Sequence, residues 1–276
     1  MAVLSSMMGW YFRKRMLSIE HGLKHAAETQ HKVLKRLIDD AKDTEWGKQF
    51  DYRSIKSYSD FKQRVPVQDY DSLKPYIEKV MKGEVNVLWP GEIIWFAKSS
   101  GTTNDKSKFI PLTSESIEEN HFHGSKDVLT IYYSALPDSD LLMGKGLVIG
   151  GSHQVHPLEE NFQYGDLSAV LLQNSPFWSS FIRTPELSIA LMDEWENKIE
   201  SLAQSTINED VSSISGVPTW TMVLLKRILE ISGKKNIKEV WPNFEVYIHG
   251  GVSFTPYKNE FNKLIGPGCN YVEIYN

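Results

Sequence analysis

The last third of the chain alternates predicted strands with predicted helices, and this alternation constrains the fold more than any other feature. Apolar runs at 211–214, 244–248 and 271–275 predict strands, and the stretches at 218–231 and 256–265 predict helices. Pro218 stands where a proline in the first turn of a helix is favoured. Strands that alternate with helices pair in parallel through right-handed crossovers. We therefore expect an α/β fold built from a mostly parallel sheet flanked by helices.

The first two thirds of the chain predict both kinds of element in a less regular order. Short apolar runs at 93–97, 109–112 and 146–151 predict strands. Apolar residues three and four positions apart predict an N-terminal helix at 19–41 that packs on the core. Helices are also predicted at 114–135, with Ser114 as the N-cap, and at 185–204. At 276 residues the chain could form one large domain or two smaller ones, and no linker marks a boundary.

The composition excludes several classes of protein. The 276 residues are 41% apolar, which is enough for a substantial core and excludes a disordered chain. The formal net charge of -5 gives no support to nucleic-acid binding. The single cysteine, Cys269, excludes an internal disulfide. No histidine stands near Cys269 in the sequence to activate it, so we do not expect a catalytic thiol.

The start of the chain does not match a secretory signal. The basic residues Arg13, Lys14 and Arg15 follow the apolar start, whereas a secretory signal places its charges first. No apolar run is long enough to cross a bilayer. We therefore expect a cytoplasmic protein that has neither nucleic acid nor a membrane as a partner. The sequence does not indicate an oligomeric state.

Two pairs of histidines are close enough in sequence to be considered as metal ligands. They are His121 with His123 and His153 with His156. Neither pair is accompanied by a cysteine or carboxylate cluster at the spacing of zinc ligands. We therefore expect no protein-bound transition metal.

A loop rich in hydroxyl groups lies between the predicted strands at 93–97 and 109–112. Its chemically informative residues are Ser99, Ser100, Gly101, Thr102, Thr103, Lys106 and Lys108. Hydroxyl and backbone N–H groups donate to phosphate oxygens, a glycine permits close approach, and lysine supplies charge. The loop is not a Walker loop, because no Gly-Lys-Ser/Thr run leads into a helix. A polyphosphate site is one interpretation of the loop, and a solvated turn is the other.

The predicted strand and the hydroxyl-rich loop with Lys108 resemble the first nucleotide signature of adenylate-forming enzymes of the firefly-luciferase-like superfamily. The closest match is the auxin-responsive Gretchen Hagen family of acyl-acid–amido synthetases, in its bacterial branch. The segments at 47–52, 66–70 and 89–98 are also similar to that branch. The segment at 247–252 resembles the glycine turn that borders adenine, and Tyr275-Asn276 resembles the opening of the second signature.

This resemblance implies that 1–276 is a truncated N-terminal adenylation domain, about half of a family member. The Ser-Glu pair of the second signature, whose glutamate helps to hold magnesium, does not follow Tyr275-Asn276 within this sequence. The aspartate that binds ribose and the mobile C-terminal domain are also absent from it. We therefore expect an incomplete large N-terminal domain of an adenylate-forming enzyme, inactive by itself.

The resemblance also implies the reaction. ATP activates a carboxylic acid as an acyl adenylate, and the amine of an amino acid then displaces AMP to form an amide. The substrates would be a small-molecule carboxylic acid and an amino acid, neither of them identified by the sequence. ATP would bring Mg²⁺ with it, held mostly by phosphates and water. Two alternatives stay open: a coenzyme A ligase of the same superfamily, and a non-catalytic nucleotide-binding remnant.

By the same resemblance, the loop residues bind the β- and γ-phosphates. The phosphate-binding set is Ser99, Ser100, Gly101, Thr102 and Thr103. Lys108 aligns with the lysine that neutralises phosphate charge, and we interpret it as catalytic. Lys106 would assist, although an ordinary solvated lysine is the alternative.

The remaining implied contacts concern adenine and the acyl group. Gly250, Gly251 and Val252 would lie along the edge of adenine, and Tyr275 would stack on its face. A turn between a strand and a helix, and a tyrosine in the core, are the alternatives. Val217 and Trp220 would line an apolar acyl slot at the end of a strand, although core packing is the alternative there.

Overall fold

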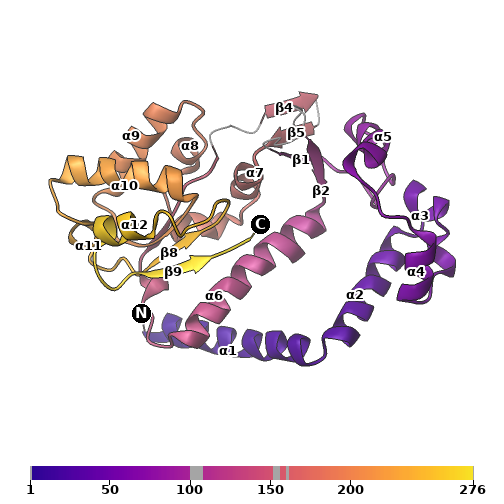
Figure 1. Cartoon of the computed structure of the whole chain (residues 1–276), viewed down its shortest axis with the longest axis horizontal. Coiled ribbons are helices and arrows are strands. Elements are labelled where there is room, and N and C mark those ends of the chain that lie inside the picture. Colours follow the sequence, from indigo (N-terminus) through magenta and orange to yellow (C-terminus); the bar gives the residue numbers. More distant parts are fainter. Residues whose placement is uncertain (1, 100–107, 152–155, 160–161, 276) are drawn as a thin grey trace. The chain divides into compact units, whose positions relative to one another are not determined.

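The computed structural model describes residues 2–99, 108–151, 156–159 and 162–275. The chain divides into two compact units, each described below by itself. Unit 1 comprises Met1–Pro137 and His156–Tyr164, and unit 2 comprises Asp138–Val155 and Gly165–Asn276. Figure 1 labels the helices and strands. Within the described residues, no helix combines the length and the apolar character needed to cross a membrane.

Unit 1 contains most of its helices in the first 81 residues (Figure 1). They are α1 (Ala2–Lys24), α2 (Ala26–Ala41), α3 (Glu45–Gln49), η1 (Tyr52–Ser54), α4 (Tyr58–Arg64) and α5 (Tyr70–Met81). The π-helical turn η2 (Ser116–Phe122) and helix α6 (His123–Ala135) follow later in the chain. The sequence predicted one helix at 19–41, whereas the structure has two helices that meet at His25, whose backbone is not helical. Helix α1 begins at Ala2, earlier than predicted, because its first turns lack a regular apolar period.

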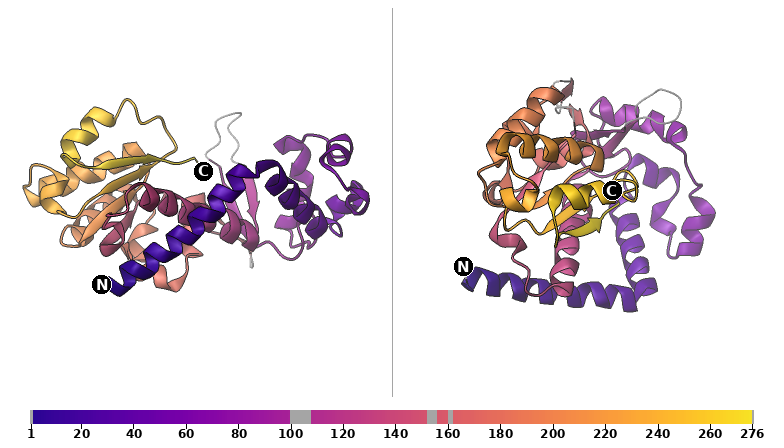
Figure 2. Two further views of the ribbon diagram at one scale, coloured as in Figure 1. Left: turned by 90° about the horizontal axis from the view of Figure 1, so that it is seen from below. Right: turned by 60° about the vertical axis from the view of Figure 1, so that its left-hand side comes forward.

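Helix α1 packs along helix α6, in indigo and magenta in Figure 2. The rings of Phe12 and Tyr133 are stacked with centroids 4.8 Å apart. Arg15 donates to both carboxylate oxygens of Asp127, at 2.6 and 2.8 Å. The apolar face of α2 contributes Ile38 to a separate buried cluster with α3 and η1. The structure therefore has the predicted packing of an N-terminal helix on the core.

The sheet of unit 1 contains the hairpin around the hydroxyl-rich loop. Its strands are β1 (Trp95–Lys98), β2 (Phe109–Leu112), β4 (His156–Glu159) and β5 (Phe162–Gly165), in the order β2-β1-β5-β4. β1 pairs with β2 antiparallel, and β4 pairs with β5 antiparallel. Phe96 and Phe162 bring the sheet against Ile77 and Val80 of α5 in one buried cluster. This packing places β2 beside α5.

The sheet of unit 2 confirms the expected parallel arrangement. Its strands are β3 (Lys145–Val148), β6 (Arg183–Thr184), β7 (Val211–Ser215), β8 (Val246–His249) and β9 (Asn270–Glu273), in the order β6-β3-β7-β8-β9. Every neighbouring pair in it is parallel. The carboxyl ends of these strands therefore lie along one edge of the sheet. That is the edge at which α/β proteins bind ligands.

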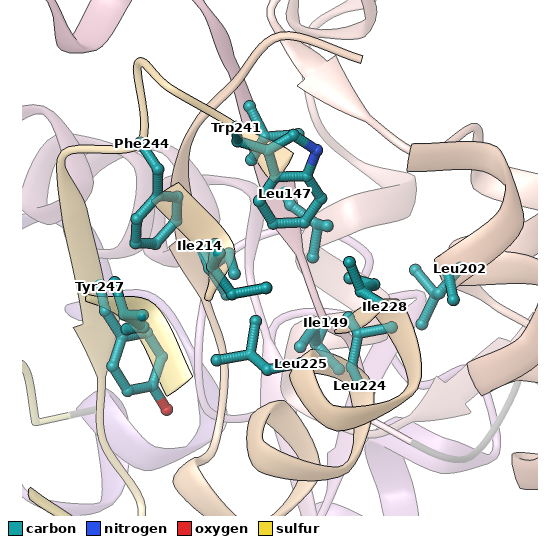
Figure 3. Close-up of a cluster of buried hydrophobic side chains, with 14 of the residues drawn as sticks. Leu147, Ile149, Leu202, Ile214, Leu224, Leu225, Ile228, Trp241, Phe244 and Tyr247 are labelled. Atoms are coloured by element: carbon teal, nitrogen blue, oxygen red, sulfur yellow. The ribbon is translucent and has the colours of Figure 1, made fainter. Parts of the chain in front are cut away.

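Helices of unit 2 supply the other half of its core. They are α7 (Leu167–Gln173), α8 (Leu187–Ala190), α9 (Trp195–Thr206), α10 (Pro218–Ser232), α11 (Ile237–Val240) and α12 (Lys258–Ile265), with 3₁₀ turns η3 (Leu141–Met143) and η4 (Phe177–Phe181). Ile214 from β7 meets Leu224 and Leu225 from α10 in one buried cluster (Figure 3). Pro218 opens α10 as predicted.

Two predicted helix features differ from the structure. The helix predicted at 185–204 is two helices, α8 and α9, and Glu194 starts the second by accepting a hydrogen bond from the Asn197 N–H at 2.9 Å. The start of α9 was not predicted from the sequence, because the residues around it have good helix propensity. The hydroxyl that caps the helical segment after β2 belongs to Thr113 and not to Ser114, because Thr113 Oγ1 accepts from the Ser116 N–H at 3.0 Å.

The burial pattern of α10 predicts that two nearby substitutions lower the free energy of unfolding by different amounts. Leu225 is fully buried, whereas the side chain of Val223 is 47% exposed. We expect Leu225→Ala to lower the free energy of unfolding by about 2–5 kcal/mol, since it loses apolar burial and leaves a cavity. Val223→Ala should change it by about 0.5 kcal/mol or less. Urea unfolding followed by circular dichroism measures both. Equal costs for the two variants would contradict this assignment of the core.

Candidate functional site

The described ends of the hydroxyl-rich loop close the hairpin between β1 and β2. The Ser99 N–H donates to the carbonyl oxygen of Lys108 at 2.9 Å. In return, the Lys108 N–H donates to Ser99 Oγ at 3.2 Å. The loop itself, with Ser100, Gly101, Thr102, Thr103 and Lys106, lies outside the described residues. The structure therefore places Ser99 and Lys108 side by side at the base of this loop.

Two lysines at the base of this hairpin lie over aromatic rings. Lys108 Nζ lies 5.3 Å from the centroid of the Tyr70 ring, and Lys98 Nζ lies 5.5 Å from that of Tyr164. Both distances are within the range of a cation–π interaction. Among the described residues, neither ammonium forms an ion pair with a carboxylate. Neither ammonium is therefore in direct contact with a described carboxylate. Lys98 was not among the predicted site residues.

The glycine turn after β8 has structural reasons for both of its glycines. A Cβ on Gly250 would lie 2.4 Å from the carbonyl oxygen of Ile274, just beyond β9, so no side chain fits there. Gly251 has a φ of 81°, in the left-handed region that favours glycine. The sequence suggested close approach of a ligand as the reason for these glycines. The structure shows a close approach of the backbone at Ile274 to Gly250, and the predicted approach of a ligand stays a prediction.

The predicted residues around this turn are only partly brought together. A Cβ on Gly251 would lie 3.5 Å from Val217 Cγ2, so Val217 is adjacent to the turn. The side chain of Val252 is exposed. Trp220 packs against the core, with its ring 5.4 Å from that of Trp195. The side chain of Tyr275 is fully exposed. The adenine and acyl roles of these residues stay predictions.

His249 is a feature of this turn that sequence reasoning missed. It is the last residue of β8, its side chain is 3% exposed, and its ring stacks on Phe254 with centroids 4.0 Å apart. Nδ1 has no hydrogen-bond partner among the described residues. Burial lowers the pKa of His249, and the charge of Glu273, its register partner on β9, opposes that shift. A lone histidine on a strand gives no sequence indication of this burial.

Lys198 is a second missed residue at the same edge of the sheet. It is fully buried, and Nζ donates to the carbonyl oxygens of Gly151 at 2.6 Å and Gly150 at 3.3 Å. Burial lowers the pKa of Lys198, and the charges of Asp166 and Asp193 oppose that shift. Its ammonium therefore fixes the turn that follows β3. In the sequence, Lys198 is indistinguishable from the solvated lysines of an amphipathic helix.

The described residues add two observations on metals and thiols. No group of three histidine, cysteine, aspartate or glutamate side chains within them is arranged to hold a metal ion. Of the histidines considered from the sequence, His153 lies outside the described residues. Burial raises the pKa of the Cys269 thiol to about 12, so the thiolate needed for nucleophilic chemistry is not formed near neutral pH.

The buried imidazole predicts a stability that depends on pH. Because the pKa of His249 is lowered by folding, the unfolded chain takes up the proton first as the pH falls below about 6.5. We therefore expect the free energy of unfolding to decrease between about pH 7 and about pH 5, by at most about 1.4 kcal/mol per pH unit from this group. His249→Asn should show a smaller decrease in urea unfolding, while the exposed-site control His31→Asn should match the wild type. An unchanged pH dependence in His249→Asn would contradict the assignment.

Comparison with known proteins places the chain in one family. The profile of the GH3 family N-terminal domain matches residues 15–269. Indole-3-acetic acid-amido synthetase GH3.2 of Arabidopsis thaliana is 30% identical over 137 residues, which cover 49% of this chain and 24% of that protein. Indole-3-acetic acid-amido synthetase GH3.4 of the same plant is 28% identical over 176 residues, or 63% of this chain and 28% of that protein. The aligned part is therefore well under two thirds of the length of these relatives.

Solved structures share the fold. The GH3.15 acyl acid amido synthetase superposes with a TM-score of 0.74 at 15% identity, covering 94% of this chain and 55% of that chain. An open conformation of 2-hydroxyisobutyryl-CoA ligase superposes with a TM-score of 0.51 at 12% identity, covering 89% of this chain and 52% of that chain. At these identities the likeness shows the fold alone, an α/β fold that this chain shares with both enzymes. Because the family profile covers most of the sequence, the chain belongs to the GH3 family and corresponds to its N-terminal domain.

Proposed function

We propose that the chain provides the ATP- and acid-binding part of an acyl-acid–amido synthetase that works in the cytoplasm. The match to the GH3 N-terminal domain supports this proposal, as do relatives whose names are those of amido synthetases. The observation that carries it is the hairpin between β1 and β2, with Ser99 and Lys108 paired at its base. The identities of the acid and of the amine stay open, and the bacterial branch stays a prediction.

The proposed reaction overcomes the poor leaving group of a carboxylate. A carboxylate oxygen attacks the α-phosphorus of ATP, the bond from that phosphorus to the bridging oxygen breaks, and pyrophosphate leaves. The amine of an amino acid then attacks the acyl carbon, loses a proton, and expels AMP as the amide forms. Negative charge on phosphate oxygens dominates the first step, so positioning and electrostatic stabilisation should supply most of the catalysis.

The phosphate roles follow from the hairpin. We assign the β- and γ-phosphates to Ser99, Ser100, Gly101, Thr102 and Thr103, with charge supplied by Lys108 and assistance from Lys106. The described end of the loop fits an anion, because the ammonium of Lys108 has no ion pair among the described residues and is exposed. Mg²⁺, when bound with ATP, would neutralise further phosphate charge. These assignments rest on the family resemblance and on the electrostatics at the base of the loop.

The adenine roles concern the glycine turn after β8 and the ring of Tyr275. We assign the edge of the base to Gly250, Gly251 and Val252, and its face to Tyr275. The turn lies at the carboxyl edge of a parallel sheet, where ligands bind in α/β folds. The ring of Tyr275 is fully exposed and therefore available for stacking. Val217, next to Gly251, could contribute to the acyl slot, whereas the packing of Trp220 favours a core role.

The phosphate assignment predicts unequal effects of two nearby lysine substitutions. Lys108→Ala should weaken MgATP binding about tenfold or more, because a charge-assisted contact to phosphate is lost. Lys106→Ala should weaken it by less, since Lys106 only assists. Isothermal titration calorimetry with MgATP and with AMP measures both affinities, and the AMP affinity should not change. Equal and negligible effects on MgATP binding would contradict the phosphate assignment and favour the interpretation of the loop as a solvated turn.

Product analysis distinguishes the amido synthetase from a coenzyme A ligase, the alternative kept open by the shared fold. A full-length protein that contains this N-terminal domain is incubated with ATP and mixed carboxylic acids, and either an amino-acid mixture or coenzyme A is added. We expect acyl amides, AMP and pyrophosphate, detected by mass spectrometry. An acyl thioester formed with coenzyme A, without an amide from any amino acid, would contradict the proposal. Nucleotide binding without either product would favour the non-catalytic alternative.

A further inference from the structure

We propose that Tyr70 is a positioning residue of the phosphate-binding hairpin, acting through Lys108. Its ring holds the ammonium of Lys108, and its hydroxyl fixes the backbone of the next residue, Phe109. This inference rests on the proposed function, because it assigns Lys108 to phosphate. It also gives a physical role to the segment at 66–70, which the family resemblance singles out and the reaction leaves unexplained.

The hydroxyl of Tyr70 contacts the backbone on the outer side of β2, where no further described strand pairs with it. β2 is at the edge of its sheet. Ser99, just after β1, and Lys108, just before β2, are hydrogen-bonded to each other. Because hydrogen-bonded and non-hydrogen-bonded pairs alternate along antiparallel strands, the N–H and C=O of Phe109, the next residue, point away from β1. The Phe109 N–H donates to Tyr70 Oη at 2.9 Å, and Tyr70 Oη lies 3.4 Å from the Phe109 carbonyl oxygen as a weaker donor. Tyr70 thereby satisfies backbone groups that an edge strand leaves unpaired.

The ring of Tyr70 places the charge of Lys108. Nζ of Lys108 lies 5.3 Å from the ring centroid, so the face of the ring attracts the ammonium. Asp69 is close enough for the charge of Lys108 to contribute to the lowering of its pKa, behind larger contributions from hydrogen bonds with Ser72. The Asp69 carboxylate caps α5 by accepting from the Ser72 N–H at 2.8 Å and the Ser72 hydroxyl at 2.6 Å.

The combination holds the cation without neutralising it. Among the described residues, Lys108 makes no ion pair, and the Asp69 carboxylate, whose Oδ1 accepts from Ser72, acts on Lys108 only at longer range. A quadrupole attracts an ammonium but carries no net charge, so the positive charge stays available to an anion. Tyr70 of α5 therefore contacts the end of the loop twice, through the backbone of Phe109 and through the side chain of Lys108.

Substitutions at Tyr70 separate its two contacts. Tyr70→Leu removes both the ring and the hydroxyl, and should weaken MgATP binding about three- to tenfold while AMP binding is unchanged. Tyr70→Phe keeps the ring over Lys108, and should weaken MgATP binding by less than Tyr70→Leu does. Tyr76→Leu is the matched control: it lies on the same helix, and its ring lies 5.8 Å from a different ammonium, that of Lys79. It should leave MgATP binding unchanged. Calorimetry gives the affinities at a temperature where thermal unfolding shows every variant folded.

A double substitution tests whether Tyr70 acts through Lys108. If it does, the combination of Tyr70→Leu with Lys108→Ala binds MgATP no more weakly than Lys108→Ala alone. Additive losses, or a Tyr70→Leu variant with wild-type MgATP affinity, would overturn the inference while leaving the proposed function intact. Equal losses of MgATP and AMP affinity would also overturn it, because they indicate a general structural role. A wild-type chain that binds no ATP would overturn the proposed function and this inference with it.

Discussion

The parallel pairing of β3, β7, β8 and β9 is the constraint on which the architecture of unit 2 depends. It brings the carboxyl ends of four strands to one edge, where backbones must pass close to one another. Gly250 is needed there because the carbonyl of Ile274 occupies the space of a side chain. The buried ammonium of Lys198 compensates the carbonyl oxygens of the turn after β3. At the end of β8, the buried Nδ1 of His249 has no hydrogen-bond partner among the described residues.

In unit 1, a different constraint positions the chemistry. A hairpin at the edge of a sheet leaves every second residue with unpaired backbone groups on its outer side. Packing of Phe96 and Phe162 against α5 brings Tyr70 to that side, where it binds Phe109 and lies beneath Lys108. Tyr70 thus belongs to a helix that packs on the sheet and also contacts the lysine that we assign to phosphate. An exposed lysine held over a ring, without a carboxylate, is suited to bind an anion.

Much of the fold was predictable because it follows from local patterns. The apolar runs that predicted β1, β2, β7 and β8 lie within a few residues of the observed strands, and Pro218 opens α10 as expected. The break between α8 and α9 was not predictable, since nothing in the local sequence there disfavours a continuous helix. The antiparallel sheet of unit 1 was likewise not foreseen, because β5 joins β1 from a point more than sixty residues further along the chain.

The order of strands and helices, the hydroxyl-rich loop and the membership of the GH3 family are determined by the sequence itself, because propensity, spacing and residue type are local properties. Which groups act on that loop was decided by tertiary structure. Tyr70 and Lys108 are separated by 37 intervening residues and meet only when α5 packs beside β2. Likewise, His249 and Lys198 look like ordinary polar residues until folding removes them from water. Burial and long-range contact set their chemistry, and neither can be read from neighbouring residues in a chain.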